Sequence, residues 1–449
     1  KAFASDYQET IKNVVIHCAS RKKVQKTPSD YSAHDLTTND LEYIRKNSIG
    51  NIQDIFSLIP LQEGILFEYL KNRKTIAYVI QQTLQIEKNI KKDILKQAIR
   101  LCILRHDALR IAIFHEHIEK ARLVVLKERP GEFEAIDLSG LDKEKQEHEL
   151  KEILRADVER GFDLQKDILF RAKFIDQGDA NSKLILCFHH IIVDGWSQSI
   201  IFKSIQHYYE QLSSGCSYED LKKNIQNNID SLPNYSAYLK KVENFDRKKG
   251  LDFWRNLIGD YEDVLEIKTL EKDEERPSEV VEQSFKLSAE LSKQLLQLSL
   301  SNHITLNTIF ETAVGIVLQR YNATNKSIIG KVISGREADV EMIEEMVGLF
   351  VNTIPVPVNN ENKDRTVKEL LMSMQQQAIN SLNYAYNSLA DIQKMSSIAS
   401  NLFQTLLVFE NHDFEGEVAE SSEALRLNLL NTREETGYGQ TIFACMMDG

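Results

Sequence analysis

Two adjacent histidines between a short apolar run and a longer helical pattern constrain this chain most. Residues 184–188 (LILCF) predict a buried strand, and residues 196–212 predict a helix. His189 and His190 therefore lie where a strand ends in a loop, a position that active sites often occupy. The order of strand, loop and helix makes this segment the first place to look for chemistry.

The two imidazoles are expected to face different surroundings. Successive side chains of an extended segment point to opposite faces, so one of His189 and His190 can serve chemistry while the other packs. The same geometry argues against both rings binding one metal ion. Neither a cysteine pair nor a third histidine stands nearby at zinc-ligand spacing, so no metal site is predicted.

A carboxylate and a glycine follow the histidines at fixed offsets. Asp194 is interpreted as structural, because an ionised carboxylate close to a sheet needs a cationic partner or backbone donors. Gly195 permits a tight turn, and the amides after it open a helix where a developing oxyanion could be received. A single histidine at a strand end is usually a packing or surface residue. The pair of histidines with Asp194 and Gly195 favours a functional site instead.

The stretch HHIIVDGWS, residues 189–197, resembles the HHxxxDG signature of condensation domains of nonribosomal peptide synthetases. Further segments are similar to those of the family in order and spacing, and they extend over about residues 51–449: 57–67 (SLIPLQEGILF), 105–110 (RHDALR, for RHExLR), 334–336 (SGR) and 347–353 (VGLFVNT, for GxFVNT). Asp107 replaces the family's usual Glu. An Arg that often follows the Asn-Thr pair is replaced by residues 355–357 (PVP), so its role is not assigned here.

The resemblance implies the fold of chloramphenicol acetyltransferase. This is an α/β fold, α+β in two layers, with two lobes that each hold a mixed sheet and helices and form a V-shaped pseudo-dimer around one site. Three regions are expected. Residues 1–50 form the tail of an upstream domain and a linker. Residues 51–225 form the N-terminal lobe with the histidine motif, and residues 226–449 form the C-terminal lobe, whose end looks incomplete.

The resemblance also implies the reaction, namely peptide-bond formation by an acyltransferase in antibiotic or other secondary metabolism. An upstream peptidyl carrier domain would present an aminoacyl or peptidyl thioester, and a downstream carrier would present the amine. The prosthetic group is 4′-phosphopantetheine on these partner carriers, and the domain itself is expected to bind no cofactor. Neighbouring synthetase domains would supply the activated substrates, because no ATP-binding glycine loop is evident in the sequence.

Residue roles carry over to the matching positions. His190 is expected to orient the attacking amine or to take its proton, since the reference pKa of an α-amine, about 8, already leaves part of it neutral. His189 is expected to be structural, and the Gly195 amide to contact the oxyanion or the pantetheine carbonyl. Asp194 is expected to pair with Arg336.

Other positions are expected to support or line the site. Arg320 is a less suitable match than Arg336 for the partner of Asp194. Arg105 and Arg110 are expected to give structural or salt-bridge support. The expected tunnel or substrate-lining residues are Trp196, Ser197, Asn352 and Gln62.

A coarse reading of periodicity predicts further elements. In the first lobe these are helices over 60–70 and 90–105 and strands over 75–86 and 122–126. In the second lobe Thr305 is expected to cap a helix that runs to Tyr321, and strands are expected over 281–287 and 327–334. A further helix is expected near residues 7–20, before the breaking sequence TPSD.

The subtype follows from resemblance alone. Residues 60–64 (PLQEG) and 409–411 (FEN) look like forms common in domains that join a D-configured donor to an L-configured acceptor. One alternative is an epimerization domain of the same fold, which residues 437–439 (GYG) favour and the order Trp196-Ser197 disfavours. Another is a non-catalytic docking or recruitment domain, against which the intact motif argues. The double histidine speaks against heterocyclization, and the linker-like first 50 residues favour an assembly-line module over a freestanding coenzyme A acyltransferase.

Composition limits the partners. A formal net charge of −12 makes nucleic acid an unsuitable partner, because phosphate binding needs a concentrated basic surface. No apolar run is long enough to cross a bilayer, so no membrane association is expected. Five cysteines without a pattern suit a reducing compartment, and the expected location is cytoplasmic.

Overall fold

The histidine motif lies at the end of the central strand of a five-stranded sheet. The computed structural model describes residues 2–20, 26–73, 76–86, 90–178, 182–229, 231–265, 267, 283–398, 401–410, 424–433 and 438–446. In the sheet order β11-β2-β7-β6-β5, the strands are β2 (Val79–Ile86), β5 (Glu132–Asp137), β6 (Phe170–Asp176), β7 (Ser182–His189) and β11 (Leu427–Arg433). Strand β7 is antiparallel to both of its neighbours, with His189 opposite Val79 on β2.

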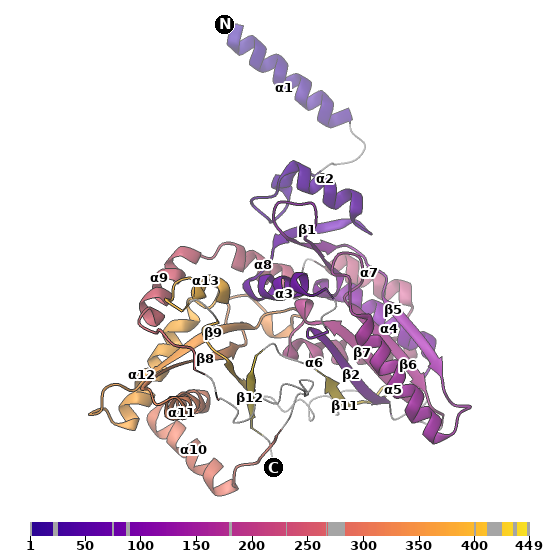
Figure 1. Ribbon diagram of the computed structural model, residues 1–449. Helices are drawn as coiled ribbons and strands as arrows, with labels where there is room; N and C mark the ends of the chain where they lie inside the picture. The colour runs from indigo at the N-terminus through magenta and orange to yellow at the C-terminus, as the bar shows by residue number, and fades with distance from the viewer. Residues whose placement is uncertain are drawn as a thin grey trace.

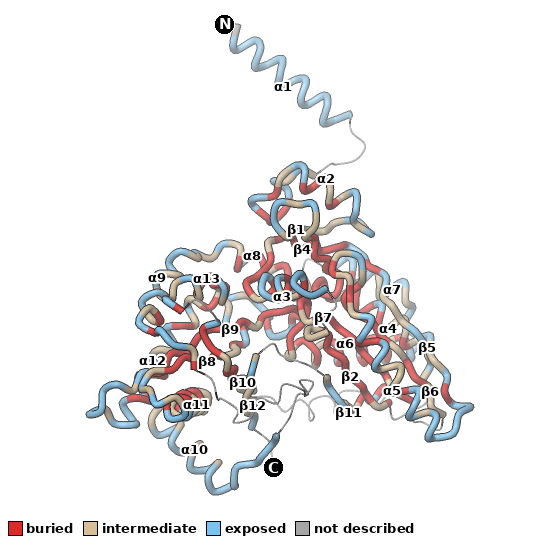
Figure 2. Tube along the Cα trace, viewed as in Figure 1, coloured by how far each residue is buried: buried red, intermediate tan, exposed pale blue. Residues whose placement is uncertain are grey.

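Both faces of this sheet are covered because the side chains of β7 alternate between two apolar layers. Ile185 packs with Leu150 of helix α5 (Lys143–Arg160) on one face. Leu184 and Leu186 belong to the main core with helices α4 (Lys92–Arg105) and α6 (Gly195–Ser213), which pack on each other. Buried positions concentrate along β2 and β7 (Figure 2). The motif therefore leaves a rigid, fully paired strand.

A second sheet, of four strands, forms the centre of the other lobe. Its order is β12-β10-β8-β9, with β8 (Lys326–Ile333), β9 (Asn352–Asn359), β10 (Thr405–Glu410) and β12 (Gln440–Cys445). Strand β8 is antiparallel to β9 and parallel to β10. Ile329 packs towards helices α11 (Leu306–Tyr321) and α12 (Val367–Leu382), and Ile328 packs towards α9 (Arg247–Ile258) and α13 (Leu389–Gln393).

A small third sheet joins the N-terminal segment to the first lobe. Its order is β1-β4-β3, with β1 (Ile52–Ser57), β3 (Ile111–Phe114) and β4 (Arg122–Leu126). Helix α2 (Thr38–Asn47) buries Leu41 and Ile44 against this sheet, and the Thr37 side chain caps its first turn. Much of the predicted linker over 1–50 is thus part of the fold, and the sequence reading missed α2. Helix α1 (Ala2–Ser20) projects away from the rest of the chain (Figure 1).

Two elements from after the predicted boundary at 225 belong to the first lobe. Strand β11 comes from the C-terminal part of the chain but pairs antiparallel with β2 of the first lobe (Figure 1). Helix α8 (Tyr235–Glu243) also packs into the first-lobe core through Tyr235 and Tyr238. Pairing with β11 covers the edge of β2 that would otherwise expose backbone donors and acceptors. Residues 226–449 therefore do not form the second lobe alone.

Most of the predicted elements are present, with shifts of a few residues at their ends. The predicted strand over 281–287 is wrong in its described part. Residues 281–282 lie outside the described residues, and 283–287 have no regular structure, with Phe285 86% exposed. Residues 283–287 pair with no strand among the described residues. The remaining elements are α3 (Pro60–Lys71), α7 (Tyr218–Asn228), α10 (Ala289–Asn302), η1 (Pro28–Asp30), η2 (Asp107–Arg110), η3 (His190–Ile192) and η4 (Ile343–Glu345).

Across the described part of the chain, each helix is too short or too polar to span a bilayer.

Candidate functional site

His189 is a packing residue. It ends β7 with 3% of its surface exposed, and its Nδ1 accepts a hydrogen bond from the Ile191 amide at 3.2 Å. The rings of Tyr69, Tyr78 and Phe162 surround it at centroid distances of 6.0 to 6.4 Å. Burial, and to a smaller extent the charge of His190, lowers the pKa of His189 to about 3. The ring is therefore neutral at physiological pH, which suits a structural role.

His190 occupies different surroundings because the chain turns at this residue. It is half-buried and begins the single 3-10 turn η3, and its amide donates to the Tyr78 carbonyl oxygen at 2.8 Å. Residue 190 thus lies in a turn, whereas the sequence argument assumed an extended segment over both histidines. Gln62 holds this turn in place, because its Nε2 donates to the Ile191 carbonyl oxygen at 2.9 Å.

Asp194 is the centre of a buried hydrogen-bond network between the lobes. The carboxylate is 1% exposed and caps α6 by accepting from the Ser197 amide at 2.9 Å. It also accepts from the Phe350 amide at 3.1 Å and from Arg336 Nη2 at 3.2 Å. Arg320, the less favoured match, lies instead in the last turn of α11. These contacts tie the start of α6 to the segment before β9.

The Nη1 group of Arg336 donates to two backbone oxygens, and two aromatic rings lie beside the guanidinium plane. Its Nη1 donates to the Ile343 carbonyl oxygen at 2.6 Å and to that of Met346 at 3.1 Å. The guanidinium carbon lies 4.1 Å from the centroid of the Phe350 ring and 5.5 Å from that of Trp196. A planar cation held by carbonyls and aromatic faces has a single preferred position, which gives the Asp194 contact a fixed direction.

Ser197 and Gln62, which are predicted to line a tunnel, line neither of the two cavities described below. Ser197 is fully buried, with its Oγ 2.7 Å from Asp194 Oδ1 and 2.8 Å from the Gly348 carbonyl oxygen. Gln62 is also fully buried, and its Oε1 accepts from the Ile59 amide at 3.1 Å. Both polar side chains find partners inside the protein, which removes them from contact with a substrate.

The RHDALR segment supports the site through backbone oxygens. Arg105 Nη1 donates to the Pro233 carbonyl oxygen at 2.8 Å, and the fully buried Arg110 donates to the Lys127 carbonyl oxygen at 3.1 Å. Asp107 accepts from the amides of Tyr235 and Ser236 at 2.8 and 2.9 Å. The shorter Asp therefore anchors the start of α8, a role that the sequence reading did not assign.

A cavity of about 1060 Å³ opens between the two lobes beside the start of α6. Gly195 and Trp196 line it from the first lobe, with Arg105 and His106, and strand β8 and helices α11 and α12 line it from the second. The indole Nε1 of Trp196 donates across the lobes to the Glu344 carbonyl oxygen at 3.0 Å.

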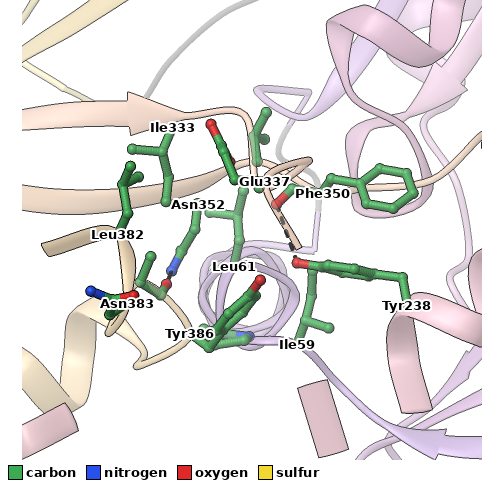
Figure 3. A pocket seen from close by; sticks show the side chains of 14 residues that line it. Ile59, Leu61, Tyr238, Ile333, Glu337, Phe350, Asn352, Leu382, Asn383 and Tyr386 are labelled. Carbon is green, nitrogen blue, oxygen red and sulfur yellow. Dashed lines mark hydrogen bonds between the residues drawn. The ribbon is translucent and has the colours of Figure 1, made fainter. Parts of the chain in front are cut away.

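A smaller cavity of about 150 Å³ adjoins the first and shares Ile333, Glu337, Val351 and Leu382 with it. Figure 3 shows Tyr238, with its hydroxyl directed at the Phe350 carbonyl oxygen, on one side of this space and Leu382 and Asn383 on the other. Asn352 also lines this cavity, and its Nδ2 donates to the Ala385 carbonyl oxygen at 2.5 Å. Among the described residues that line the two cavities, His190 does not appear.

Neither the backbone conformation nor the surrounding space requires a glycine at 195, which corrects the sequence argument of a tight turn. Gly195 has a backbone conformation open to any residue, and a Cβ built on it would meet no heavy atom within 4 Å. Because Gly195 lines the larger cavity, the missing side chain leaves room at the helix N-terminus. Within the described residues, no three His, Cys, Asp or Glu side chains gather to hold a metal ion.

Comparison with known proteins places this geometry in context. A family profile described as "Condensation domain" matches residues 52–446. The chain is 31% identical over 433 residues to bacitracin synthase 3 of Bacillus licheniformis, covering 96% of the chain and 7% of that protein. It is 32% identical over 406 residues to gramicidin S synthase 2 of Brevibacillus brevis, covering 89% of the chain and 9% of that protein. The chain thus spans less than a tenth of the length of these relatives.

Solved structures share the fold at low sequence identity. The condensation domain from monacolin K polyketide synthase MokA superposes with a TM-score of 0.62 at 15% identity, covering 87% of this chain and 88% of that one. The first condensation domain of the CDA synthetase gives a TM-score of 0.61 at 14% identity, covering 87% and 89%. These likenesses confirm the predicted mixed α/β, two-lobed fold.

Proposed function

The chain belongs to the condensation-domain family, and from that premise we propose that it forms a peptide bond between substrates held on two carrier domains. The amine of the downstream aminoacyl group attacks the carbonyl carbon of the upstream thioester. The tetrahedral intermediate collapses with loss of the upstream carrier's thiol, and the proton lost by the amine balances the thiolate. The peptide remains on the downstream carrier, so the reaction is an acyl transfer.

The observation that carries this proposal is the connection of the motif to both lobes. Asp194 links the start of α6 to Arg336 and to the Phe350 amide, and the larger cavity begins at Gly195 and Trp196 on the same helix turn. Substrates that enter from either side meet a helix N-terminus held rigidly between the lobes. Positioning two tethered reactants in this way supplies a large share of the acceleration in reactions of this kind.

His190 is the residue proposed to act on the amine. Its backbone is fixed by the Tyr78 carbonyl oxygen, and the turn that it begins is fixed by Gln62. An imidazole held in this way can orient the amine or accept its proton as the intermediate forms.

The start of α6 is proposed to receive the oxyanion. Backbone amides in the first turn of a helix lack intrahelical acceptors and lie at the positive end of the helix dipole. Asp194 takes the Ser197 amide, and Gly195 lines the cavity without a side chain of its own. Gly195 would then contact the developing oxyanion or a pantetheine carbonyl.

The partners are proposed to be upstream and downstream peptidyl carriers with 4′-phosphopantetheine arms, together with neighbouring synthetase domains. The domain itself needs no cofactor for this acyl transfer. A D-configured donor is proposed on the sequence of residues 60–64 and 409–410; Asn411, which completes the second segment, lies outside the described residues, as does Gly437 of the epimerase-like GYG.

A two-carrier assay tests the proposal. Defined D- and L-aminoacyl groups are loaded on an upstream carrier, an L-aminoacyl group is loaded on a downstream carrier, and both carriers are analysed by intact-protein mass spectrometry and chiral chromatography. The proposal expects a dipeptide on the downstream carrier, formed faster from the D-donor. Inversion of the donor without a dipeptide identifies an epimerization domain. Carrier capture with neither change identifies a docking domain.

A further inference from the structure

A buried ion pair lies in the second-lobe wall of the larger cavity, outside the histidine motif. Glu311 of α11 is fully buried, and its Oε1 lies 2.5 Å from Nζ of Lys331 on β8. Lys331 is 13% exposed and lines the cavity. The ammonium therefore faces the cavity with a carboxylate directly behind it.

Stability alone is a poor reason for such a pair. Removing two charges from water costs about as much as their attraction returns, and apolar replacements of similar volume are often neutral or stabilising. The sheet and helices around this pair are apolar, with Val408 and Phe409 of β10 and Ile379 of α12 lining the cavity nearby. A charged pair within an apolar wall is better explained by what enters the cavity.

Asn307 adds a hydrogen-bond acceptor to the same wall. It lies one turn before Glu311 on α11 and lines the cavity, and residues four apart share one helix face. Its Oδ1 is buried and has no hydrogen-bond partner within the described structure. The wall thus offers a donor in Lys331 and an acceptor in Asn307, while the charge of Lys331 is balanced by Glu311.

We propose that this wall, given the condensation activity proposed above, selects a carrier-tethered amino acid with a carboxamide side chain. The amide oxygen would accept from Lys331, and the amide nitrogen would donate to Asn307. A carboxylate of the same length would leave water for an ammonium whose charge Glu311 already balances, and an ammonium would place a second positive charge beside Lys331. An apolar side chain would leave Asn307 without a donor.

Changing the charge behind Lys331 tests this proposal. Glutaminyl, glutamyl and methionyl groups, which are similar in length, are loaded on one carrier at a time, and dipeptide formation is measured for the donor and acceptor series. The native chain should use the glutaminyl substrate at least about tenfold better than the glutamyl one in one of the two series, since the glutamyl carboxylate loses its hydration without gaining an uncompensated cation. In Glu311→Gln the uncompensated Lys331 should shift this ratio towards the glutamyl substrate by about tenfold or more.

Two further variants complete the test. Glu311→Leu combined with Lys331→Met removes the pair without leaving a buried charge, and should abolish the preference for glutaminyl over methionyl. Glu210→Gln makes the same chemical change at an exposed position of α6 and should leave all ratios unchanged. If methionyl substrates are still joined but the Glu311→Gln ratios equal those of the native chain in both series, the carboxamide assignment is wrong while the condensation activity stands.

Discussion

Replacing Asp194 should destabilise the protein strongly, because this carboxylate neutralises a buried cation. In Asp194→Ala, the guanidinium of Arg336, whose side chain is 5% exposed, loses its carboxylate partner. Breaking a buried ion pair by removing one partner costs about 3–5 kcal/mol. The amides of Ser197 and Phe350 also lose their acceptor, at about 1–3 kcal/mol each. These terms share one network and do not add fully, so a total near 5 kcal/mol is expected.

A double-mutant cycle separates the ion pair from the rest. Arg336→Met removes the cation and keeps much of the side-chain volume, so Asp194→Ala with Arg336→Met should be about 1–3 kcal/mol more stable than the sum of the single changes predicts. The measurement is urea unfolding, followed by tryptophan fluorescence and far-UV circular dichroism, with both signals checked for coincidence. An Asp194→Ala protein with the native unfolding midpoint would refute the structural role of this carboxylate.

Three further predictions concern two buried histidines, a crowded glycine and a glycine that lines the larger cavity. Stability should fall as the pH drops from about 6.5 towards 3, because over this range His189, whose folded pKa is about 3, takes up a proton only in the unfolded chain. The free energy of unfolding should decrease by about 1.4 kcal/mol per pH unit, and His106, whose pKa is lowered by burial, adds a similar slope. Unfolding midpoints independent of pH would contradict this. Gly335→Ala should cost at least about 1–3 kcal/mol, since Gly335 has φ +68° and a Cβ would lie 2.0 Å from the Phe350 carbonyl oxygen; an unchanged midpoint would contradict it. Gly195→Ala should keep its unfolding midpoint but slow dipeptide formation, and native turnover would show that no substrate group reaches this glycine.

Local patterns predicted much of the fold because they reflect local physics. A continuous apolar run over residues 184–188 marked β7, and a capping Thr305 marked the start of α11. The pairing of β11 with β2 of the first lobe could not be predicted in this way, since strand pairing over more than 300 residues leaves no periodic signal. Helix α2 was missed because its sequence is mostly polar, with few apolar residues to mark its buried face.

The candidate site, like the fold, could be predicted from the sequence only in part. Spacing along the chain singled out the histidine pair with Asp194 and Gly195, and resemblance selected His190 and supplied the partner Arg336. The burial of Ser197 and Gln62 depends on carbonyl and amide groups from distant segments, which no side-chain pattern reveals. The Glu311–Lys331 pair was likewise invisible, because a helix residue and a strand residue twenty positions apart meet only after the second lobe has folded.

The most direct test of the central claim is single-turnover dipeptide formation between two loaded carriers by the native chain and by His190→Ala and His190→Gln. Loss of a positioned acid–base group is expected to slow the reaction by about 10²–10⁴-fold. The unfolding midpoints should stay native, because the Tyr78 carbonyl oxygen and Gln62 hold the backbone of the turn at His190. Folded His190→Ala protein that joins the two substrates at the native rate would contradict the account.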